Sequence, residues 1–317
     1  MGVVNVRDVV PKIRRLNNMK EGSASCVLCG CTRTYEKTLL SRFLDLPENT
    51  VSRVYKCAKC KLLFLFPVVK ESELEALYSK SYFDGGSADL QGCTLPGSGE
   101  SYKEFANMRL EKFRKTIESV EKYVGFNKRY LDIGAATGEF LNEAKLRGNI
   151  TKGIEISEHA AQRARIEKKL DVETVRLEVF DSKDTFDVIH LNHVLEHFID
   201  PNEALEKISV LLGEKGIVYV EVPYQFNIVE MIKALVGKRK KFGVFSVHHA
   251  LFFTPKTLKA LFERYGYEVI SINVYSKNRF PSDGGGIRSL KLVVWRFLSV
   301  FKQGIFIEGY FRRLTDL

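Results

Sequence analysis

The chain has 317 residues, with 49 Lys or Arg against 39 Asp or Glu, and its formal net charge is +10. This length suits one full domain plus a smaller unit. Charges interrupt the apolar stretches well before the ~20 residues that a membrane span needs, and no N-terminal run resembles a signal peptide, so we expect a cytoplasmic protein. The positive charge favours an anionic partner such as nucleic acid, a nucleotide-linked substrate or an acidic membrane surface, unless it is only a solvated basic face.

Five of the six cysteines lie close together in the N-terminal part of the chain. Two CxxC pairs, Cys26 with Cys29 and Cys57 with Cys60, can each turn so that both thiolates face one ion. Four thiolates complete the tetrahedral shell of zinc, which leaves no open position for catalysis. Without a secretion signal, this clustering favours metal over disulfides. We therefore predict a structural zinc site at these four residues, with Cys31 as an alternative ligand.

The next segments lead from the cysteines to the main domain. Residues 61–69 predict a strand that Pro67 ends, and residues 71–80 predict a helix. The stretch 85–99 is rich in Gly, Ser and Pro, which is typical of a loop near a binding site. Apolar residues then recur at helical spacing from Ala106 to Val124. That helix should pack on a sheet.

The stretch RYLDIGAATGEFL begins at Arg129 and predicts a strand, a loop of small residues and a helix over 139–147. This is how a Rossmann-like unit begins, with a nucleoside bound at the carboxyl edge of a parallel sheet. Asp132 would repel a pyrophosphate at the helix N-terminus. A cationic ligand without phosphate, such as S-adenosylmethionine, suits it better and relaxes the need for glycine at Ala135 and Ala136.

A second acid supports this interpretation. Glu155 lies near the end of the next predicted strand, Lys152 to Ile156, where a carboxylate accepts hydrogen bonds from two ribose hydroxyls. The loop and this acid resemble the DxGxxxG motif and second-strand acid of the class I S-adenosylmethionine-dependent methyltransferases. The motif positions are met by Asp132, Gly134, Gly138 and Glu155.

Beyond the loop, strands and helices alternate, which predicts a doubly wound, mostly parallel α/β sheet. Further strands are predicted at 152–156, 170–174, 186–192, 216–222 and 267–275.

The segment FDVIHLNHVLEHFIDP, starting at Phe186, resembles another signature of the same methyltransferases at Leu195, Glu196 and His197. The strand should end beside the methyl group of the cofactor, so we expect Asn192 and His193 at the cleft. On a helix, His193 and His197 would share a face. A metal pair is conceivable, but the sequence shows no evident third ligand, and a hydrogen-bonded histidine in a cleft wall is more common.

The order of CxxC pairs, LYSKSYF, helix and core resembles the bacterial sugar C-methyltransferases from about Cys26 to Ser276. The resemblance implies that the aromatic residues of an N-terminal segment, here Tyr78, Tyr82 and Phe83, close over the site, although they could equally fill an interdomain core.

The same resemblance bears on the general base. Those enzymes use an acid followed by histidine in proton abstraction. This chain has His248 in place of the acid and keeps His249. Histidine suits proton removal because its unperturbed pKa is ~6.5. We rank the candidate bases as His249, then His248, then His193 or His197.

These patterns divide the chain into four predicted parts. They are a zinc-ribbon domain (1–69), a helical linker or lid (70–125), an S-adenosylmethionine-binding core (126–276) and a C-terminal tail (277–317). The basic run 238–241 is either solvated or a contact for a substrate phosphate. In the tail, residues 290–306 could form a last antiparallel strand or an amphipathic helix at a partner or membrane surface. We favour packing against the core.

The predicted function is methylation of a sugar, a nucleotide-linked sugar or a related small molecule. Two alternatives remain open. The net charge and the zinc ribbon favour an RNA methyltransferase, and a nonenzymatic zinc-ribbon adaptor could retain the same fold.

Overall fold

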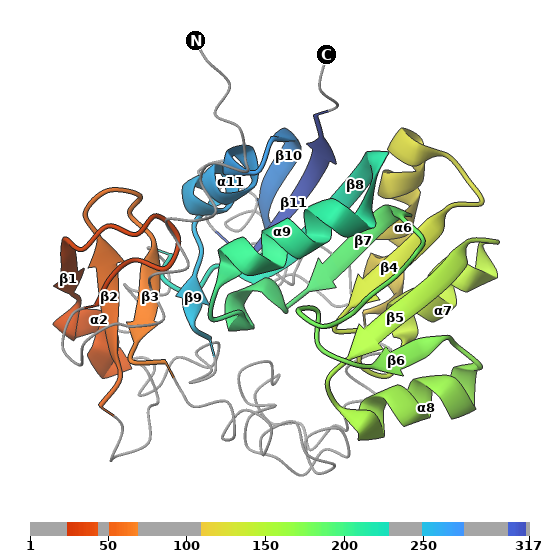
Figure 1. Ribbon diagram of the computed structural model, residues 1–317, viewed down its shortest axis with the longest axis horizontal. Coiled ribbons are helices and arrows are strands. Elements are labelled where there is room, and N and C mark those ends of the chain that lie inside the picture. The colour runs from red at the N-terminus through yellow and green to blue at the C-terminus, as the bar shows by residue number, and fades with distance from the viewer. Residues whose placement is uncertain (1–23, 44–50, 69–108, 228–248, 276–303, 315–317) are drawn as a thin grey trace, which may run out of the picture.

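The computed structural model describes residues 24–43, 51–68, 109–227, 249–275 and 304–314, which form two sheets with their covering helices (Figure 1). The predicted helix at 71–80, the lid residues Tyr78, Tyr82 and Phe83, the basic run 238–241 and His248 lie outside these ranges. Within them, no helix has the length and apolar character needed to cross a membrane.

The larger sheet has seven strands in the order β10-β11-β8-β7-β4-β5-β6. The five strands from β8 to β6 run parallel, and β11 is antiparallel to both of its neighbours. This confirms the predicted doubly wound α/β fold. The strand bounds are β4 (Arg129–Ile133), β5 (Ile150–Glu155), β6 (Val172–Thr174), β7 (Phe186–Asn192), β8 (Leu212–Pro223), β10 (Tyr267–Tyr275) and β11 (Phe306–Arg313).

Helices cover both faces of this sheet, and two hydrophobic cores result. Apolar residues of α9 and α11 pack in one core, and those of α6, α7 and α8 pack in the other. Figure 1 shows α9 lying across the first face. The strands supply both cores because successive side chains alternate between faces. The helix bounds are α6 (Leu110–Val124), α7 (Glu139–Leu146), α8 (Glu158–Lys168), α9 (Pro201–Leu211) and α11 (Pro255–Arg264).

Local sequence explains where the helices of the first face begin. The carboxylate of Asp200 accepts a hydrogen bond from the Asn202 amide at 2.8 Å, just before α9. Thr254 and Thr257 form a reciprocal capping box at the start of α11. In both helices proline occupies the first position, where its missing N–H leaves no intrahelical bond unmade.

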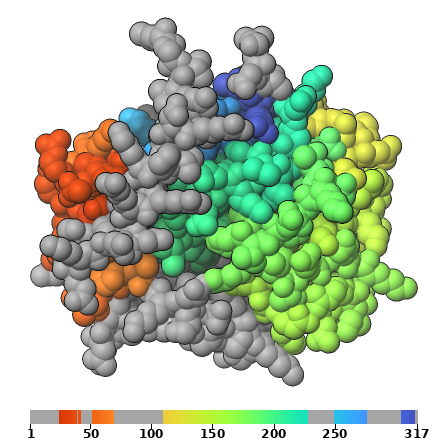
Figure 2. All heavy atoms as spheres, viewed as in Figure 1, coloured from red at the N-terminus to blue at the C-terminus, as the bar shows by residue number. Residues whose placement is uncertain are grey.

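The smaller sheet contains β1 (Thr34–Glu36), β2 (Arg53–Cys57), β3 (Leu63–Phe66) and β9 (Leu251–Phe252), with the short helix α2 (Thr38–Phe43) beside it. Its fourth strand, β9, comes from the range assigned to the core and pairs antiparallel with β3. The Asn202 side chain of α9 also donates to the Val27 carbonyl at 2.7 Å. The N-terminal unit, red to orange in Figures 1 and 2, is therefore joined to the core by a strand as well as by packing.

The core sheet extends past residue 276, where the sequence analysis placed its end. β11 lies at 306–313, later than the segment that we considered for a last strand, and it inserts between β8 and β10. Ile307 and Phe311 are fully buried in the α9/α11 core. The Phe311 ring stacks on Phe262 of α11 at a centroid distance of 3.7 Å. Burial of this apolar face holds the C-terminal strand in the sheet.

Replacing Phe311 with Ala should lower the free energy of unfolding by about 3–5 kcal/mol, because it leaves a cavity beneath α11. Chemical denaturation of both proteins measures the difference. Val210→Ala is the control, since Val210 is 73% exposed on α9 and should change stability by less than about 0.5 kcal/mol. Equal losses for the two variants would contradict the role assigned to β11.

Candidate functional site

The loop between β4 and α7 is shaped by two glycines with positive φ. Gly134 has φ +74°, and a Cβ there would lie 2.4 Å from Cγ2 of Val194. Gly138 has φ +81°, and its Cβ would lie 2.4 Å from Cδ1 of Leu170. Left-handed backbone and lack of space both exclude a side chain. The loop is thereby packed closely against the segments that follow β7 and α8.

Asp132, which we expected to face a cationic ligand, is buried against the neighbouring strand. It is 3% exposed, and its Oδ1 lies 2.7 Å from Nδ1 of His190 on β7. The His190 ring stacks between Phe140 and Tyr219. Burial raises the pKa of Asp132 and lowers that of His190. The register that places these residues opposite each other makes Asp132 a link between strands β4 and β7.

Glu155 ends β5, as predicted, and holds the loop from the other side. Its Oε2 accepts from the Ala136 amide at 2.8 Å and its Oε1 from the Ser157 amide at 2.9 Å. Burial raises the pKa of this carboxyl, while the backbone N–H groups oppose that rise. A carboxylate has about four acceptor sites. These backbone donors, the Ile156 amide included, use part of this capacity, and the rest is available to a bound ligand.

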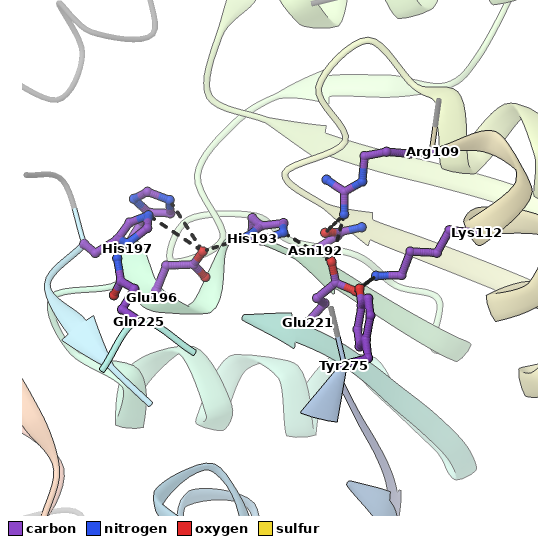
Figure 3. Close-up of polar contacts among 10 residues, drawn as sticks. Arg109, Lys112, Asn192, His193, Glu196, His197, Glu221, Gln225 and Tyr275 are labelled. Carbon is purple, nitrogen blue, oxygen red and sulfur yellow. Dashed lines mark hydrogen bonds and ion pairs between the residues drawn. The ribbon is translucent and has the colours of Figure 1, made fainter. Parts of the chain in front are cut away.

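Asn192 ends β7 and is oriented by an arginine from the start of α6 (Figure 3). Its Oδ1 accepts from Nη2 of Arg109 at 2.7 Å. Its Nδ2 is buried and has no hydrogen-bond partner within the described residues. A buried donor of this kind costs free energy unless a ligand accepts from it. Asn192 is thus a candidate contact for a bound molecule.

Glu221 on β8 is the centre of a buried ionic network that the sequence analysis missed. It accepts from Arg109 at 2.9 Å and from the Tyr275 hydroxyl at 2.5 Å, and it pairs with Lys112 (Figure 3). The partners come from α6 and β10, which are far from Glu221 in the chain, so local spacing could not predict these contacts. One signal was available, because Glu221 is a lone acid in the apolar run IVYVEVPY.

His193 lies between two carboxylates. Its Nε2 is 3.2 Å from Oε1 of Glu221 and its Nδ1 is 3.4 Å from Oε1 of Glu196 (Figure 3). The residue has φ +56°, a left-handed conformation that is uncommon outside glycine and turns the chain out of β7. Burial, with Arg109 and Lys112 nearby, lowers the pKa of His193 well below its ordinary value. The imidazole is therefore neutral at neutral pH.

Three histidines lie around the Glu196 carboxyl group. Its Oε1 lies 4.0 Å from Nε2 of His197 and 3.9 Å from Nε2 of His249, in addition to the His193 contact. Glu196 is 1% exposed, and burial raises its pKa to about 8. The shared helix face considered for His193 and His197 is not formed, because only Leu195–His197 make a turn, the 3-10 helix η3.

The four predicted zinc ligands converge in the N-terminal unit. The Sγ atoms of Cys26, Cys29, Cys57 and Cys60 all lie within 4.8 Å of one another. The closest pairs, Cys26 with Cys60 and Cys29 with Cys57, are 3.5 Å apart. Cys31 is outside this group, and its thiol faces the Arg33 carbonyl.

Replacing Glu221 with Gln should destabilise the protein by about 3–5 kcal/mol, because it removes a buried charge shared by Arg109 and Lys112. Chemical denaturation measures the change. Glu111→Gln is the matched control, since Glu111 pairs with Lys115 at 2.6 Å and both side chains are more than half exposed. That pair should contribute less than about 1 kcal/mol. A loss of similar size in both variants would contradict the stabilising role assigned to the Glu221 network.

The family model described as "Methyltransferase domain" matches residues 102–272, more than half of the chain. No curated protein sequence matches the chain.

Among solved structures, the 1,6-didemethyltoxoflavin-N1-methyltransferase of Burkholderia thailandensis, with 1,6-didemethyltoxoflavin and S-adenosylhomocysteine bound, has a TM-score of 0.50 at 13% identity. The match covers 85% of this chain and 99% of that one. A SAM-dependent methyltransferase from Archaeoglobus fulgidus has a TM-score of 0.48 at 17% identity, covering 68% and 100% of the two chains. A possible histamine N-methyltransferase from Thermotoga maritima has a TM-score of 0.45 at 21% identity, covering 67% and 95%.

The first of these structures shares the fold of the core. With more than half of its length matched by the family model, the chain belongs to the methyltransferase domain family and is a methyltransferase.

Proposed function

We propose that the protein transfers the methyl group of S-adenosylmethionine to a small-molecule acceptor, and that this acceptor is a sugar or a nucleotide-linked sugar. The observation that carries the proposal is the pair of acids, Asp132 and Glu155, at the ends of adjacent parallel strands on either side of the glycine loop. Such an edge binds a nucleoside, and acids there suit one without phosphate.

The residues of the loop fit this cofactor. Glu155 keeps acceptor capacity for ribose hydroxyls. The buried Nδ2 of Asn192 is a donor that needs an acceptor, which the cofactor's carboxylate would provide. We propose that Asp132, Gly134, Ala136 and Gly138 complete the site together with His193. When bound, S-adenosylmethionine supplies a methyl group on a sulfonium, and the protein aligns the acceptor with it and removes its proton.

The histidines beside Asn192 are the proposed acid–base groups. His193, His197 and His249 surround Glu196 at the carboxyl edge of β7. A neutral imidazole accepts a proton near neutral pH, and the buried His193 is held in that form. His249, the first candidate base by resemblance, lies in this cluster. His248 is retained as a candidate on the same resemblance.

The acceptor class rests on the order of motifs shared with sugar C-methyltransferases. The fold is compatible with small acceptors, because the solved enzyme from Burkholderia thailandensis holds 1,6-didemethyltoxoflavin. The second candidate is RNA, favoured by the net charge of +10. RNA binding that falls steeply with salt would select it over a sugar.

Glu155→Gln should weaken S-adenosylmethionine binding by about ten- to a hundredfold, because a hydrogen bond to a charged group contributes about 1.5–3 kcal/mol. Isothermal titration measures the affinity, and circular dichroism checks the fold. Glu173→Gln, an exposed acid on the adjacent strand β6, should bind as tightly as the wild type. If the wild type does not bind S-adenosylmethionine and binds a dinucleotide instead, the proposed function is wrong.

We also propose that the four cysteines hold a structural zinc ion. A tetrahedral site with Zn–S bonds of ~2.3 Å has sulfur atoms ~3.8 Å apart, close to the 3.5 Å of the nearest pairs. The Cys57 sulfur also accepts from the amides of Lys59 and Cys60, which suits a thiolate.

Cys57→Ser should lose about one equivalent of zinc per chain and lower the melting temperature, because a four-thiolate site stabilises the fold of the unit around it. Metal analysis and thermal unfolding provide the two readouts. Cys31→Ser is the control, since Cys31 is outside the cluster, and it should keep both values. Loss of zinc from the Cys31 variant alone would reassign the ligand set.

A further inference from the structure

We infer that the chain has a second metal site, in which Glu196, His197 and His249 bind a divalent transition-metal ion at the carboxyl edge of the core sheet. One carboxylate oxygen and one ring nitrogen from each histidine all lie within 4.8 Å of one another. Two imidazoles and a carboxylate form a three-residue ligand set that leaves positions open for water or a substrate oxygen. This site is separate from the four cysteines, which belong to the N-terminal unit.

The spacing of the donor atoms fits an ion better than direct hydrogen bonds. Oε1 of Glu196 is 4.0 Å from Nε2 of His197 and 3.9 Å from Nε2 of His249, beyond the roughly 3.2 Å limit of a good hydrogen bond. Around an ion with bonds of ~2.0–2.1 Å, tetrahedral neighbours are ~3.4 Å apart. An inward shift of about half an ångström between Glu196 and each of the two histidines would bring these pairs to that spacing.

The state of the Glu196 carboxyl is the independent observation. The residue is 1% exposed, and neither of its oxygens has a hydrogen-bond partner within the described residues. Burying such a group uncompensated is costly. By contrast, the buried carboxylates Asp132, Glu155 and Glu221 each accept at least one hydrogen bond. A bound cation would supply the compensation that Glu196 otherwise lacks.

The surroundings of His249 support a ligand role. Its Nδ1 contacts the side-chain amide of Gln225. The amide Nε2 of Gln225 is the atom placed against this nitrogen. A half-turn of the amide would let its oxygen accept the Nδ1–H, and the lone pair of His249 Nε2 would then face Glu196 and His197. Metal-binding histidines usually donate their second N–H in this way. Figure 3 shows Glu196, His197 and Gln225 grouped on one side of His193.

The role of the ion in binding the methyl acceptor rests on the proposed methyl transfer. The existence of the metal site does not. At this edge, an ion would bind an oxygen of the acceptor next to Asn192. His197 and His249 would then act as ligands rather than as proton acceptors. His193 contacts Glu221 as well as Glu196, so it lies between the ion and the ionic network.

The test is the metal content of the full chain. Purified protein is stripped, loaded separately with Zn²⁺, Fe²⁺, Mn²⁺ or Co²⁺, dialysed and analysed by mass spectrometry. The wild type should retain about two equivalents of zinc per chain, one at each site. Glu196→Gln and His249→Asn should each lose one equivalent, while Cys57→Ser loses the other. Glu203→Gln, an exposed acid on α9, is the matched control and should retain both.

Cobalt spectra keep the test decisive if the cysteine variant fails to fold. Thiolate ligands give intense charge-transfer absorption, which Glu196→Gln should retain while the weaker bands of a nitrogen and oxygen site disappear. Equal metal content and equal cobalt spectra in wild type and Glu196→Gln would overturn the inference. The wild type could fail to bind S-adenosylmethionine while Glu196→Gln still loses an ion. That result would support the metal site and contradict the proposed methyl donor.

Discussion

The burial of carboxylates at one edge of the core sheet is the constraint on which the site depends. Parallel strands place their carboxyl ends side by side, and four acids are concentrated there, each 6% exposed or less: Asp132, Glu155, Glu196 and Glu221. Buried charge is tolerated only when it is paired or hydrogen bonded. Asp132 is compensated by His190, Glu155 by backbone amides and Glu221 by Arg109, Lys112 and Tyr275.

The N-terminal unit contributes to the same edge through its strand pairing. β9 joins β3 in the smaller sheet, and His249 lies two residues before β9. The pairing therefore fixes the chain direction just after His249 and brings this histidine to η3, which follows β7. The histidine cluster therefore forms only when the cysteine-rich unit is folded. This short ladder of backbone hydrogen bonds couples the two parts of the protein, together with the contact of Asn202 with Val27.

Local patterns in the sequence were enough to predict the strands β7 and β10, the glycine loop and the four clustered cysteines, because each depends on residues close together in the chain. The site beyond the loop was harder. The partners of Glu221 come from α6 and β10, and the third group beside His197 and His249 is Glu196, which the sequence analysis treated only as part of a motif. Spacing along one strand cannot show which charges meet across four elements. The contact of Asp132 with His190 could not be predicted either, because the strand register alone places the two residues opposite each other.

The position of β11 has a consequence for biosynthesis. This strand separates β8 from β10 and is antiparallel to both, yet it follows both of them in the chain. Until about Arg313 has emerged, the nascent chain holds β8 and β10 without the strand that joins them, and unpaired strand edges attract other chains. Premature termination upstream of β11 should therefore yield an aggregation-prone product rather than a smaller stable enzyme.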